Sequence, residues 1–275
     1  MRYRVLCDAV PLFLLRSVYC LKKEEDPMRE LCFEKKGGRI YGRLHTPEGS
    51  GPFPCVIICH GFGASLEDHE FYAECMEKEG IAGYCFDFIG GGPEVKSSGT
   101  MMEMSVLTET EDLLYVIDRI RELSEIDENN LFLMGGSQGG FVITEAAHRR
   151  PDQIRGLIPL YPAYVIYDYV RSRAADPDHI PETLSVLGME VSSLYAKDAF
   201  SFNIYDHMDY EGPVMIIHGT ADTLVPMSYS EKALKIFKDA QLIRIPEAGH
   251  GFYNEDEKRV AQLAIEFVKE KKLEA

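Results

Sequence analysis

The chain has 275 residues, of which 45% are hydrophobic and 27% are charged, and this is enough apolar material for one large globular core. The formal net charge is −16. Such an excess of acid argues against binding to the phosphate backbone of a nucleic acid and against attraction to an anionic membrane surface. We therefore expect no nucleic-acid partner.

Seven cysteines are scattered over the first 85 residues, without a Cys-x-x-Cys pair. This pattern predicts no zinc site, and free thiols fit a reducing compartment best, which favours a cytoplasmic location. Cys85 is an alternative nucleophile in principle. It is disfavoured because it lies inside an expected strand and not at the end of one.

Residues 1–27 are expected to be an N-terminal extension, and residues 28–275 the folded domain. The apolar stretch at residues 11–15 is short and flanked by charges, which disfavours both a cleaved signal and a membrane-spanning helix. Three interpretations stay open for this extension: a peripheral segment, a true start at Met28, and a lipoprotein-type signal that ends at Cys20.

From residue 31 onward the hydrophobic pattern predicts alternating strands and helices. A hairpin is expected over residues 31–45, with its turn at Gly37 and Gly38. Further strands are expected at residues 54–59, 81–88, 130–134, 156–160 and 241–245 and from Pro213, and helices at 68–78, 105–123, 141–150, 228–238 and 256–272. This alternation is typical of an α/β fold with a mostly parallel, doubly wound sheet and an antiparallel start.

The segment from Gly135 to Gly140 is the most informative motif, because a strand-like segment precedes it and a helix-like segment follows it. Strand, Gly-x-Ser-x-Gly and helix is the layout of a nucleophile elbow, which here presents Ser137. The flanking glycines leave room for a strained turn between crowded elements. The alternative is an ordinary glycine-rich turn in which the serine caps a helix.

Two later strands each end near a residue that a catalytic serine needs. A serine at neutral pH requires an imidazole to take its proton and a carboxylate to orient that imidazole. Asp222 follows the strand that begins at Pro213, and His250 follows the strand at residues 241–245. Taken singly, each residue fits a structural role in a loop. The chain order Ser137, Asp222, His250 is the order found in α/β-hydrolases, so together they predict a catalytic triad.

Backbone donors for an oxyanion are expected on two segments. The strand at residues 54–59 runs into a loop that starts at His60, and the second segment is the elbow itself. We assign the oxyanion hole to the backbone N–H groups of Phe62 and Gln138. His60 is expected to brace the loop and to take no part in the chemistry.

Together these motifs resemble the α/β-hydrolase-fold serine esterases, and more narrowly the intracellular cinnamoyl (feruloyl) esterases. The resemblance covers about residues 30–272 and rests on short motifs at strand ends and loops: His60 to Phe62, Cys85 to Phe88, Gly136 to Gly140, Asp178 to Pro181, His218 to Asp222 and Ala248 to His250. The chain departs from these relatives in the loop after Phe88 and in Gly136, where histidine is frequent. The resemblance implies an α/β-hydrolase fold that hydrolyses small, hydroxycinnamoyl-type esters through an acyl-enzyme, without metal or organic cofactor.

Residues 161–210 break the alternation and lie where α/β-hydrolases place a lid. Seven of the fifteen tyrosines fall in this segment. Aromatic side chains at a pocket mouth suit an apolar or aromatic acyl group, and Tyr164, Asp168 and Tyr169 are candidate substrate contacts. Asp168 is included by analogy with an acidic lid residue of the esterases that the chain resembles. For each tyrosine, packing inside the lid is the alternative.

Two other functions stay open. A serine peptidase of the same fold, such as an aminopeptidase or an acylpeptidase, would use the same triad. A non-catalytic binding module on this scaffold is disfavoured because all three triad members are present. The identity of the small-molecule ester and the oligomeric state, a homodimer included, are left open by the sequence.

Overall fold

The structure is a computed structural model that describes residues 28–173, 176 and 179–274. The expected N-terminal extension, residues 1–27, lies outside the described residues, and so do the three interpretations of it. Among the helices that the structure does describe, none combines the length and the apolar character needed to cross a membrane.

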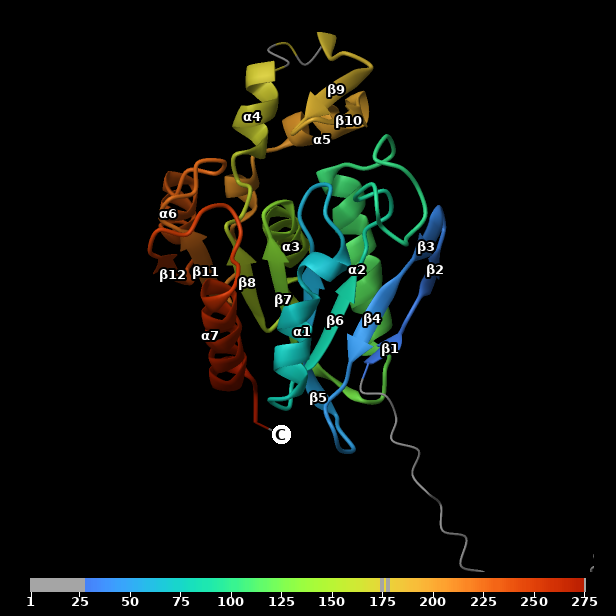
Figure 1. The fold of residues 1–275 in the computed structure, drawn as a ribbon, viewed down its shortest axis with the longest axis vertical. Helices are drawn as coiled ribbons and strands as arrows, with labels where there is room; N and C mark the ends of the chain where they lie inside the picture. The colour runs from blue at the N-terminus through green and yellow to red at the C-terminus, as the bar shows by residue number, and fades with distance from the viewer. Residues whose placement is uncertain (1–27, 174–175, 177–178, 275) are drawn as a thin grey trace, which may run out of the picture.

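An 8-stranded sheet forms the centre of the molecule, with the strand order β1-β4-β6-β5-β7-β8-β11-β12 (Figure 1). From β6 to β12 every neighbouring pair is parallel, whereas β4 pairs antiparallel with both β1 and β6. The mostly parallel sheet with an antiparallel start is therefore confirmed. The strands span Met28–Glu30 (β1), Gly42–His45 (β4), Phe53–Cys59 (β5), Ala82–Phe86 (β6), Ile126–Gly136 (β7), Gly156–Leu160 (β8), Pro213–Gly219 (β11) and Asp239–Ile245 (β12).

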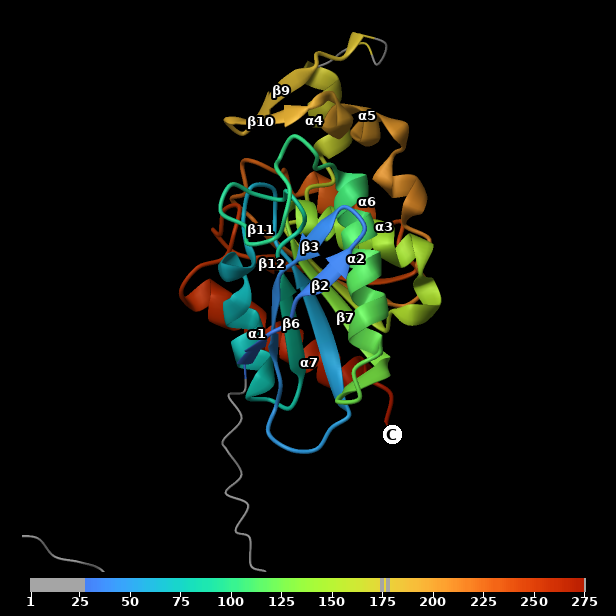
Figure 2. The ribbon, with the colours of Figure 1, turned by 90° about the vertical axis from the view of Figure 1, so that its right-hand side faces the viewer.

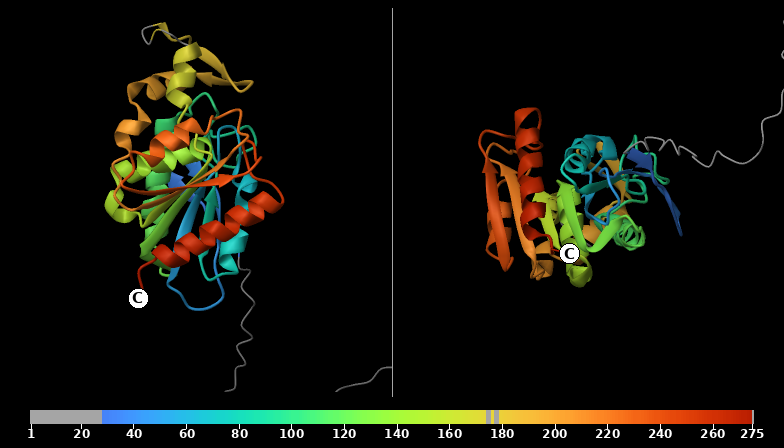
Figure 3. Two further views of the ribbon diagram at one scale, coloured as in Figure 1. Left: turned by 90° about the vertical axis from the view of Figure 1, so that its left-hand side faces the viewer. Right: turned by 90° about the horizontal axis from the view of Figure 1, so that it is seen from below.

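Helices cover both faces of this sheet, because successive side chains of a strand point to opposite sides. In β5, Cys55, Ile57 and Cys59 join one hydrophobic cluster, while Val56 and Ile58 join the other. Figure 3 shows the red helix α7 and the cyan helix α1 on one side of the sheet and the green helix α2 on the other. The helices of the Val56 side are α1 (Glu70–Glu77) and α7 (Glu255–Lys271), and those of the Cys55 side are α2 (Val106–Arg121), α3 (Gln138–Arg149) and α6 (Ser228–Leu234).

The hairpin expected over residues 31–45 is divided between two sheets. β2 (Phe33–Lys35) and β3 (Gly38–Ile40) form a separate antiparallel pair, and Gly37 makes the turn with a φ of 113° that favours glycine. The following strand, β4, leaves this pair and joins the large sheet.

The helix expected over residues 228–238 is shorter than predicted and ends at Leu234. The reason is the next strand, β12, which already begins at Asp239 because that residue pairs with Pro213 at the start of β11. The chain must therefore leave the helix early to enter the sheet in register.

Residues 161–210, which we call the inserted segment, form elements of their own between β8 and β11. β9 and β10 pair antiparallel, and α5 packs against α4 and against α2 of the main domain. Figures 1 and 2 show α4, α5, β9 and β10 grouped above the sheet. These elements span Ile166–Arg173 (α4), Thr183–Val186 (β9), Met189–Ser192 (β10) and Ser193–Ser201 (α5), followed by a 3-10 helix at Ile204–His207.

The contact between α1 and β6 depends on the absence of a side chain at Gly83. A Cβ placed there would lie 2.6 Å from the Cβ of Ala73 and 2.7 Å from its Cα. We expect Gly83→Ala to lower the free energy of unfolding by about 1–3 kcal/mol, the usual cost of overpacking, measured by urea denaturation. Gly249→Ala is the matched control, because no atom lies within 4 Å of its added Cβ. Equal urea midpoints for the two variants would contradict this packing argument.

Candidate active site

The turn between β7 and α3 consists of Ser137 alone, since β7 ends at Gly136 and α3 begins at Gln138. Ser137 has φ 52° and ψ −115°, a strained conformation for a residue with a side chain. Its N–H donates to the carbonyl of Leu160 at 2.9 Å, and its own carbonyl accepts from the N–H of Ala163 at 2.9 Å. Strand, strained serine and helix thus follow one another in the order expected of a nucleophile elbow.

Two glycines of the motif are required by close neighbours. A Cβ on Gly139 would lie 2.5 Å from the carbonyl oxygen of Cys59, at the end of β5. A Cβ on Gly136 would lie 2.3 Å from Nε2 of His69 and 2.8 Å from the hydroxyl of Tyr161. The side chains of His69 and Tyr161 therefore fill the space of a side chain at position 136, which explains the glycine that precedes the serine here.

Three side chains from three loops meet above this turn. Nε2 of His250 lies 2.9 Å from Oγ of Ser137, and Nδ1 of His250 lies 2.8 Å from Oδ2 of Asp222. An ionised carboxylate can only accept, so we assign the proton of the neutral imidazole to Nδ1, which leaves Nε2 as the acceptor for the serine hydroxyl. The ring of Tyr161 packs edge-on against this imidazole, with 4.8 Å between ring centroids.

Asp222 receives hydrogen bonds on both oxygens. Oδ1 accepts from the N–H groups of Leu224 and Val225, each at 2.9 Å, and Oδ2 lies near His250 and also 3.2 Å from Nε2 of His218. Burial by itself raises the pKa of this carboxyl. The hydrogen bonds from His218, His250 and Val225 outweigh burial and hold the pKa well below its usual value. Asp222 is therefore ionised at neutral pH.

His218 is a residue of this site that sequence reasoning missed as a partner of the carboxylate. It is fully buried, with Nε2 2.9 Å from the carbonyl oxygen of Val225 and Nδ1 2.7 Å from Oγ of Ser230. Because a carbonyl only accepts, Nε2 of His218 carries a proton and points it toward Val225 and Asp222. The sequence signal that could have identified it is a histidine inside an apolar strand, four residues before the acid.

The backbone N–H groups of Phe62 and Gln138 belong to segments that flank Ser137. Gln138 is the first residue of α3, where helix geometry leaves the N–H without an intrahelical acceptor and favours negative charge. Phe62 follows Gly61, where a Cβ would lie 3.2 Å from the Cβ of Ser137. The loop after β5 therefore passes directly beside the serine.

His60 fixes the position of this loop. Its Nε2 accepts from the N–H of Phe88 at 3.1 Å, and its Nδ1 donates to the carbonyl of Gly61 at 2.8 Å. Burial lowers the pKa of His60, which agrees with a neutral imidazole in this role. The bracing role expected for His60 is confirmed.

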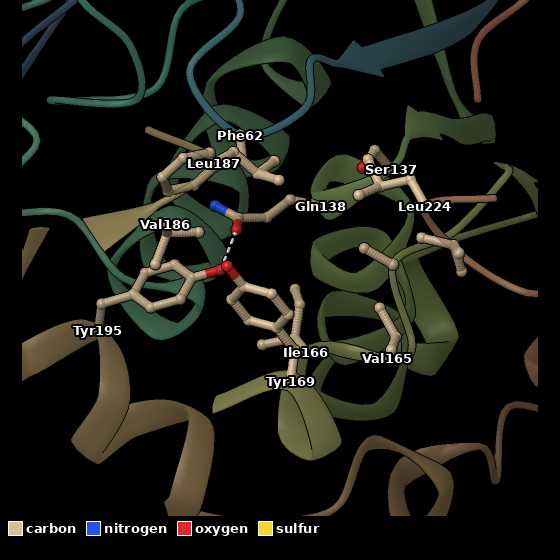
Figure 4. A pocket seen from close by; sticks show the side chains of 12 residues that line it. Phe62, Ser137, Gln138, Val165, Ile166, Tyr169, Val186, Leu187, Tyr195 and Leu224 are labelled. Carbon is tan, nitrogen blue, oxygen red and sulfur yellow. Dashed lines mark hydrogen bonds between the residues drawn. The ribbon is translucent and has the colours of Figure 1, made fainter. Parts of the chain in front are cut away.

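Two pockets meet at Ser137 and Phe62. The first, which we call the apolar pocket, receives several side chains from the inserted segment (Figure 4). Its lining is Phe62, Ser137, Gln138, Ala163, Val165, Ile166, Tyr169, Val186, Leu187, Tyr195, Leu224 and Val225. The lining of the second pocket includes more polar groups, among them Asp68, His69, Tyr72, Tyr161, His250 and Tyr253.

The three candidate substrate contacts are not brought together. Tyr169 lines the apolar pocket. Tyr164 does not line either pocket; it is buried, and its hydroxyl lies 2.9 Å from that of Thr144 on α3. Asp168 also lies outside both pockets and accepts a hydrogen bond from the hydroxyl of Tyr229 at 2.9 Å. Tyr164 and Asp168 thus have hydrogen-bond partners on α3 and α6, and their roles as substrate contacts stay predictions.

Sequence reasoning also missed Tyr195 and Glu109, which surround the side chain of Gln138. Glu109 is buried in α2, on the same helix face as Leu113 one turn later. A carboxyl group on the apolar face of an amphipathic helix was the signal that could have identified it.

In the part of the chain that the structure covers, no group of three or more His, Cys, Asp or Glu side chains is arranged to hold a metal ion.

The chain is similar to several known proteins. Residues 51–201 match the family described as serine aminopeptidase, S33, and residues 202–275 match the family described as TAP-like protein. The uncharacterized protein YfhR of Escherichia coli K12 is 26% identical over 222 residues, which cover 78% of this chain and 70% of YfhR. Esterase FrsA of Escherichia fergusonii is 24% identical over 231 residues, covering 80% of this chain and 54% of FrsA.

Solved structures show the same architecture. Est1E from Butyrivibrio proteoclasticus, solved with ferulic acid bound, is 28% identical with a TM-score of 0.79 and covers 88% of this chain and 98% of its own. A monoacylglycerol lipase from Paleococcus ferrophilus is 20% identical with a TM-score of 0.66, covers 85% of this chain and 99% of its own, and shares the fold. The α/β-hydrolase fold and the resemblance to its esterases are thus confirmed. Since the first family match spans more than half of its length, the chain belongs to the serine aminopeptidase S33 family of α/β-hydrolase-fold hydrolases.

Proposed function

We propose that the protein is a serine carboxylic-ester hydrolase that cleaves small esters with an aromatic, hydroxycinnamoyl-type acyl group. The observation that carries this proposal is the continuous hydrogen-bonded chain from Ser137 through His250 to Asp222, at the junction of two pockets. An ester bond at this junction has space for its acyl part in one pocket and for its alcohol part in the other.

The apolar pocket supports an aromatic acyl group. Phe62, Tyr169 and Tyr195 contribute rings to its wall, and Val186 and Leu187 add aliphatic surface. Aromatic acyl groups pack well against such rings, in offset or edge-on arrangements. Est1E, which shares the fold at 28% identity, has been solved with ferulic acid, an aromatic acid of this class.

In the first step, Oγ of Ser137 attacks the ester carbonyl while Nε2 of His250 takes its proton. The negative charge that develops on the carbonyl oxygen is stabilised by the backbone N–H groups of Phe62 and Gln138. Ionised Asp222 holds the imidazole in the required tautomer and stabilises the imidazolium that forms. His250 then protonates the leaving alcohol, which departs through the second pocket and leaves an acylated serine.

In the second step, a water molecule enters the position of the alcohol and attacks the acyl-enzyme. His250 takes a proton from this water as general base and returns it to Oγ of Ser137 as the acid is released. The same oxyanion donors act in both steps. All proton transfers therefore pass through Nε2 of one histidine, whose Nδ1 stays bound to Asp222.

An aminopeptidase activity is the second candidate, favoured by the description of the matching family. An aminopeptidase must bind the ammonium group of its substrate close to the scissile carbonyl, and an acidic side chain is the usual partner for such a cation. None of the described residues that line the apolar pocket is acidic. The pocket therefore suits an uncharged acyl group better than an aminoacyl group.

Ser137→Ala tests the nucleophile. Since removal of the attacking oxygen leaves only binding and oxyanion stabilisation, we expect kcat for a 4-nitrophenyl or methyl hydroxycinnamate ester to fall by roughly 10⁴-fold or more. The control is Ser124→Ala, which changes an exposed serine just before the amino end of β7. Hydrolysis by the Ser137→Ala variant at a rate near that of the wild type would rule out this mechanism.

The substrate class is tested by comparing 4-nitrophenyl esters, which release a phenol, with 4-nitroanilides, which release an aromatic amine. We expect higher kcat/KM for hydroxycinnamoyl esters than for acetyl esters, because the larger acyl group fills the apolar pocket. Aminoacyl 4-nitroanilides are expected to react slowly or not at all. A preference for the nitroanilides would assign the site to a peptidase instead.

Asp222→Asn tests the charge network through stability. In one orientation of the new amide, its NH₂ group faces the N–H donors of His218 and His250. In the other orientation it faces the N–H donors of Leu224 and Val225. Because donors then face donors, the variant should be less stable at pH 7. The folded-state pKa of Asp222 lies below its unfolded value of about 3.9, so the stabilisation is present above that pH and is lost as the pH falls. We therefore expect the difference in urea midpoint between wild type and variant to shrink below about pH 4. A constant difference between pH 7 and pH 3 would show that the charge of Asp222 contributes nothing.

A further inference from the structure

Tyr195, on α5 of the inserted segment, contacts both residues that carry the proposed oxyanion donors. Its hydroxyl donates a hydrogen bond to Oε1 of Gln138 at 2.7 Å, and its ring packs edge-on against Phe62 with 5.6 Å between centroids. The side chain is 2% exposed. Figure 4 shows Tyr195 and Gln138 joined by this bond beside the apolar pocket. One residue of the inserted segment thus touches both sides of the proposed oxyanion hole.

The other end of the Gln138 amide is held by the main domain. Its Nε2 donates to Oε2 of Glu109 at 2.8 Å and lies 3.6 Å from Sδ of Met104. Glu109 is 1% exposed, and burial raises its pKa well above the usual value, which favours the neutral form of the acid. The amide of Gln138 is therefore fixed between Glu109 on α2 and Tyr195 on α5.

From these contacts we infer that Tyr195 is a positioning residue for the oxyanion hole, an inference that rests on the proposed function. The hydroxyl of Tyr195 fixes the side chain of Gln138 at the first turn of α3, and its ring supports Phe62 in the loop after β5. When the inserted segment is docked as in this structure, both backbone donors are held in place before substrate arrives. Such preorganisation is the main source of oxyanion stabilisation, because no reorientation is needed during the reaction.

This arrangement connects acyl recognition to the rate of the chemical step. Tyr195 lines the apolar pocket together with Tyr169, Val186 and Leu187 of the inserted segment. An acyl group that fills the pocket contacts this segment and favours the docked position in which Tyr195 holds both donors. Binding energy from the acyl group therefore raises kcat and does not only lower KM.

Tyr195→Phe isolates the hydroxyl, because the ring against Phe62 is retained. Loss of one neutral hydrogen bond changes an equilibrium by about 3- to 10-fold, so we expect kcat for a hydroxycinnamate ester to fall by about that factor, with a smaller change in KM. The decrease in kcat should be smaller for an acetyl ester, which does not fill the pocket. The ratio of the two kcat values is thus expected to fall in the variant.

Tyr210→Phe is the matched control. It removes an equally buried hydroxyl, 3% exposed at the residue level, that donates to the carbonyl of Ile154 at 2.9 Å and lies outside both pockets. Both variants should lose stability to urea. Only Tyr195→Phe should lower kcat and the ratio of kcat for the hydroxycinnamate ester to kcat for the acetyl ester. Equal kinetic effects in the two variants would reduce Tyr195 to a structural residue and overturn the inference.

A trifluoromethyl ketone with the hydroxycinnamoyl acyl part gives a direct reading of the oxyanion hole, since its adduct with Ser137 carries the oxyanion. We expect Tyr195→Phe to raise the inhibition constant of the trifluoromethyl ketone by the same factor by which it lowers kcat/KM. The methyl ketone analogue keeps a trigonal carbonyl and forms no oxyanion, so its inhibition constant should change little. Equal weakening of both ketones would mean that Tyr195 only contacts the acyl group, and this would overturn a positioning role.

A double-mutant cycle with Gln138→Ala checks the route of the effect. This change keeps the backbone N–H of residue 138 and removes the amide that Tyr195 binds. Tyr195→Phe should therefore lower kcat no further in a protein that already carries Gln138→Ala. Additive losses would contradict action through Gln138. If the wild-type protein hydrolyses none of these esters, the proposed function itself fails, a result distinct from normal hydrolysis that is insensitive to Tyr195→Phe.

Discussion

The strained turn at Ser137 is the constraint on which the rest of the site depends. A serine with φ 52° costs on the order of 1–3 kcal/mol and persists only where its surroundings leave no alternative. Here the N–H is bound by Leu160 of β8, and the carbonyl accepts from the first turn of α3 and from Ala163. These bonds hold the hydroxyl above the sheet. The same crowding requires glycine at position 139, where the carbonyl of Cys59 approaches.

The parallel sheet supplies the other two members of the proposed triad at the same edge. β11 and β12 are paired in register from Pro213 and Asp239 to Gly219 and Ile245, so the loops after them leave the sheet side by side. Asp222 lies in the first loop and His250 in the second. The hydrogen bonds to Asp222 from its own loop and from buried His218 fix the carboxylate before it orients the imidazole. The position of His250 thus follows from the strand register and from a carboxylate that is already held.

These relations explain which parts of the site could be predicted from sequence. The elbow is a local motif, and strands whose carboxyl ends meet bring their loops together, so the proximity of Ser137, Asp222 and His250 could be predicted without coordinates. The surroundings of Tyr164 and Asp168 could not be predicted, because their partners, Thr144 on α3 and Tyr229 on α6, are distant in the sequence. Glu109 and Tyr195 lie 29 and 57 residues from Gln138, and no sequence pattern predicts that three such distant side chains form one network.

The electrostatics of this network fit the chemistry proposed for it. The chain carries a formal charge of −16, and an ionised carboxylate near the developing oxyanion would oppose the two backbone donors. Burial raises the pKa of Glu109 and favours its neutral form, which adds no negative charge beside Gln138. Ionised Asp222 lies beyond His250, where negative charge stabilises the imidazolium. An excess of acid on the protein as a whole is therefore compatible with an oxyanion hole, because burial disfavours the charge of Glu109 and the charge of Asp222 lies where it assists the reaction.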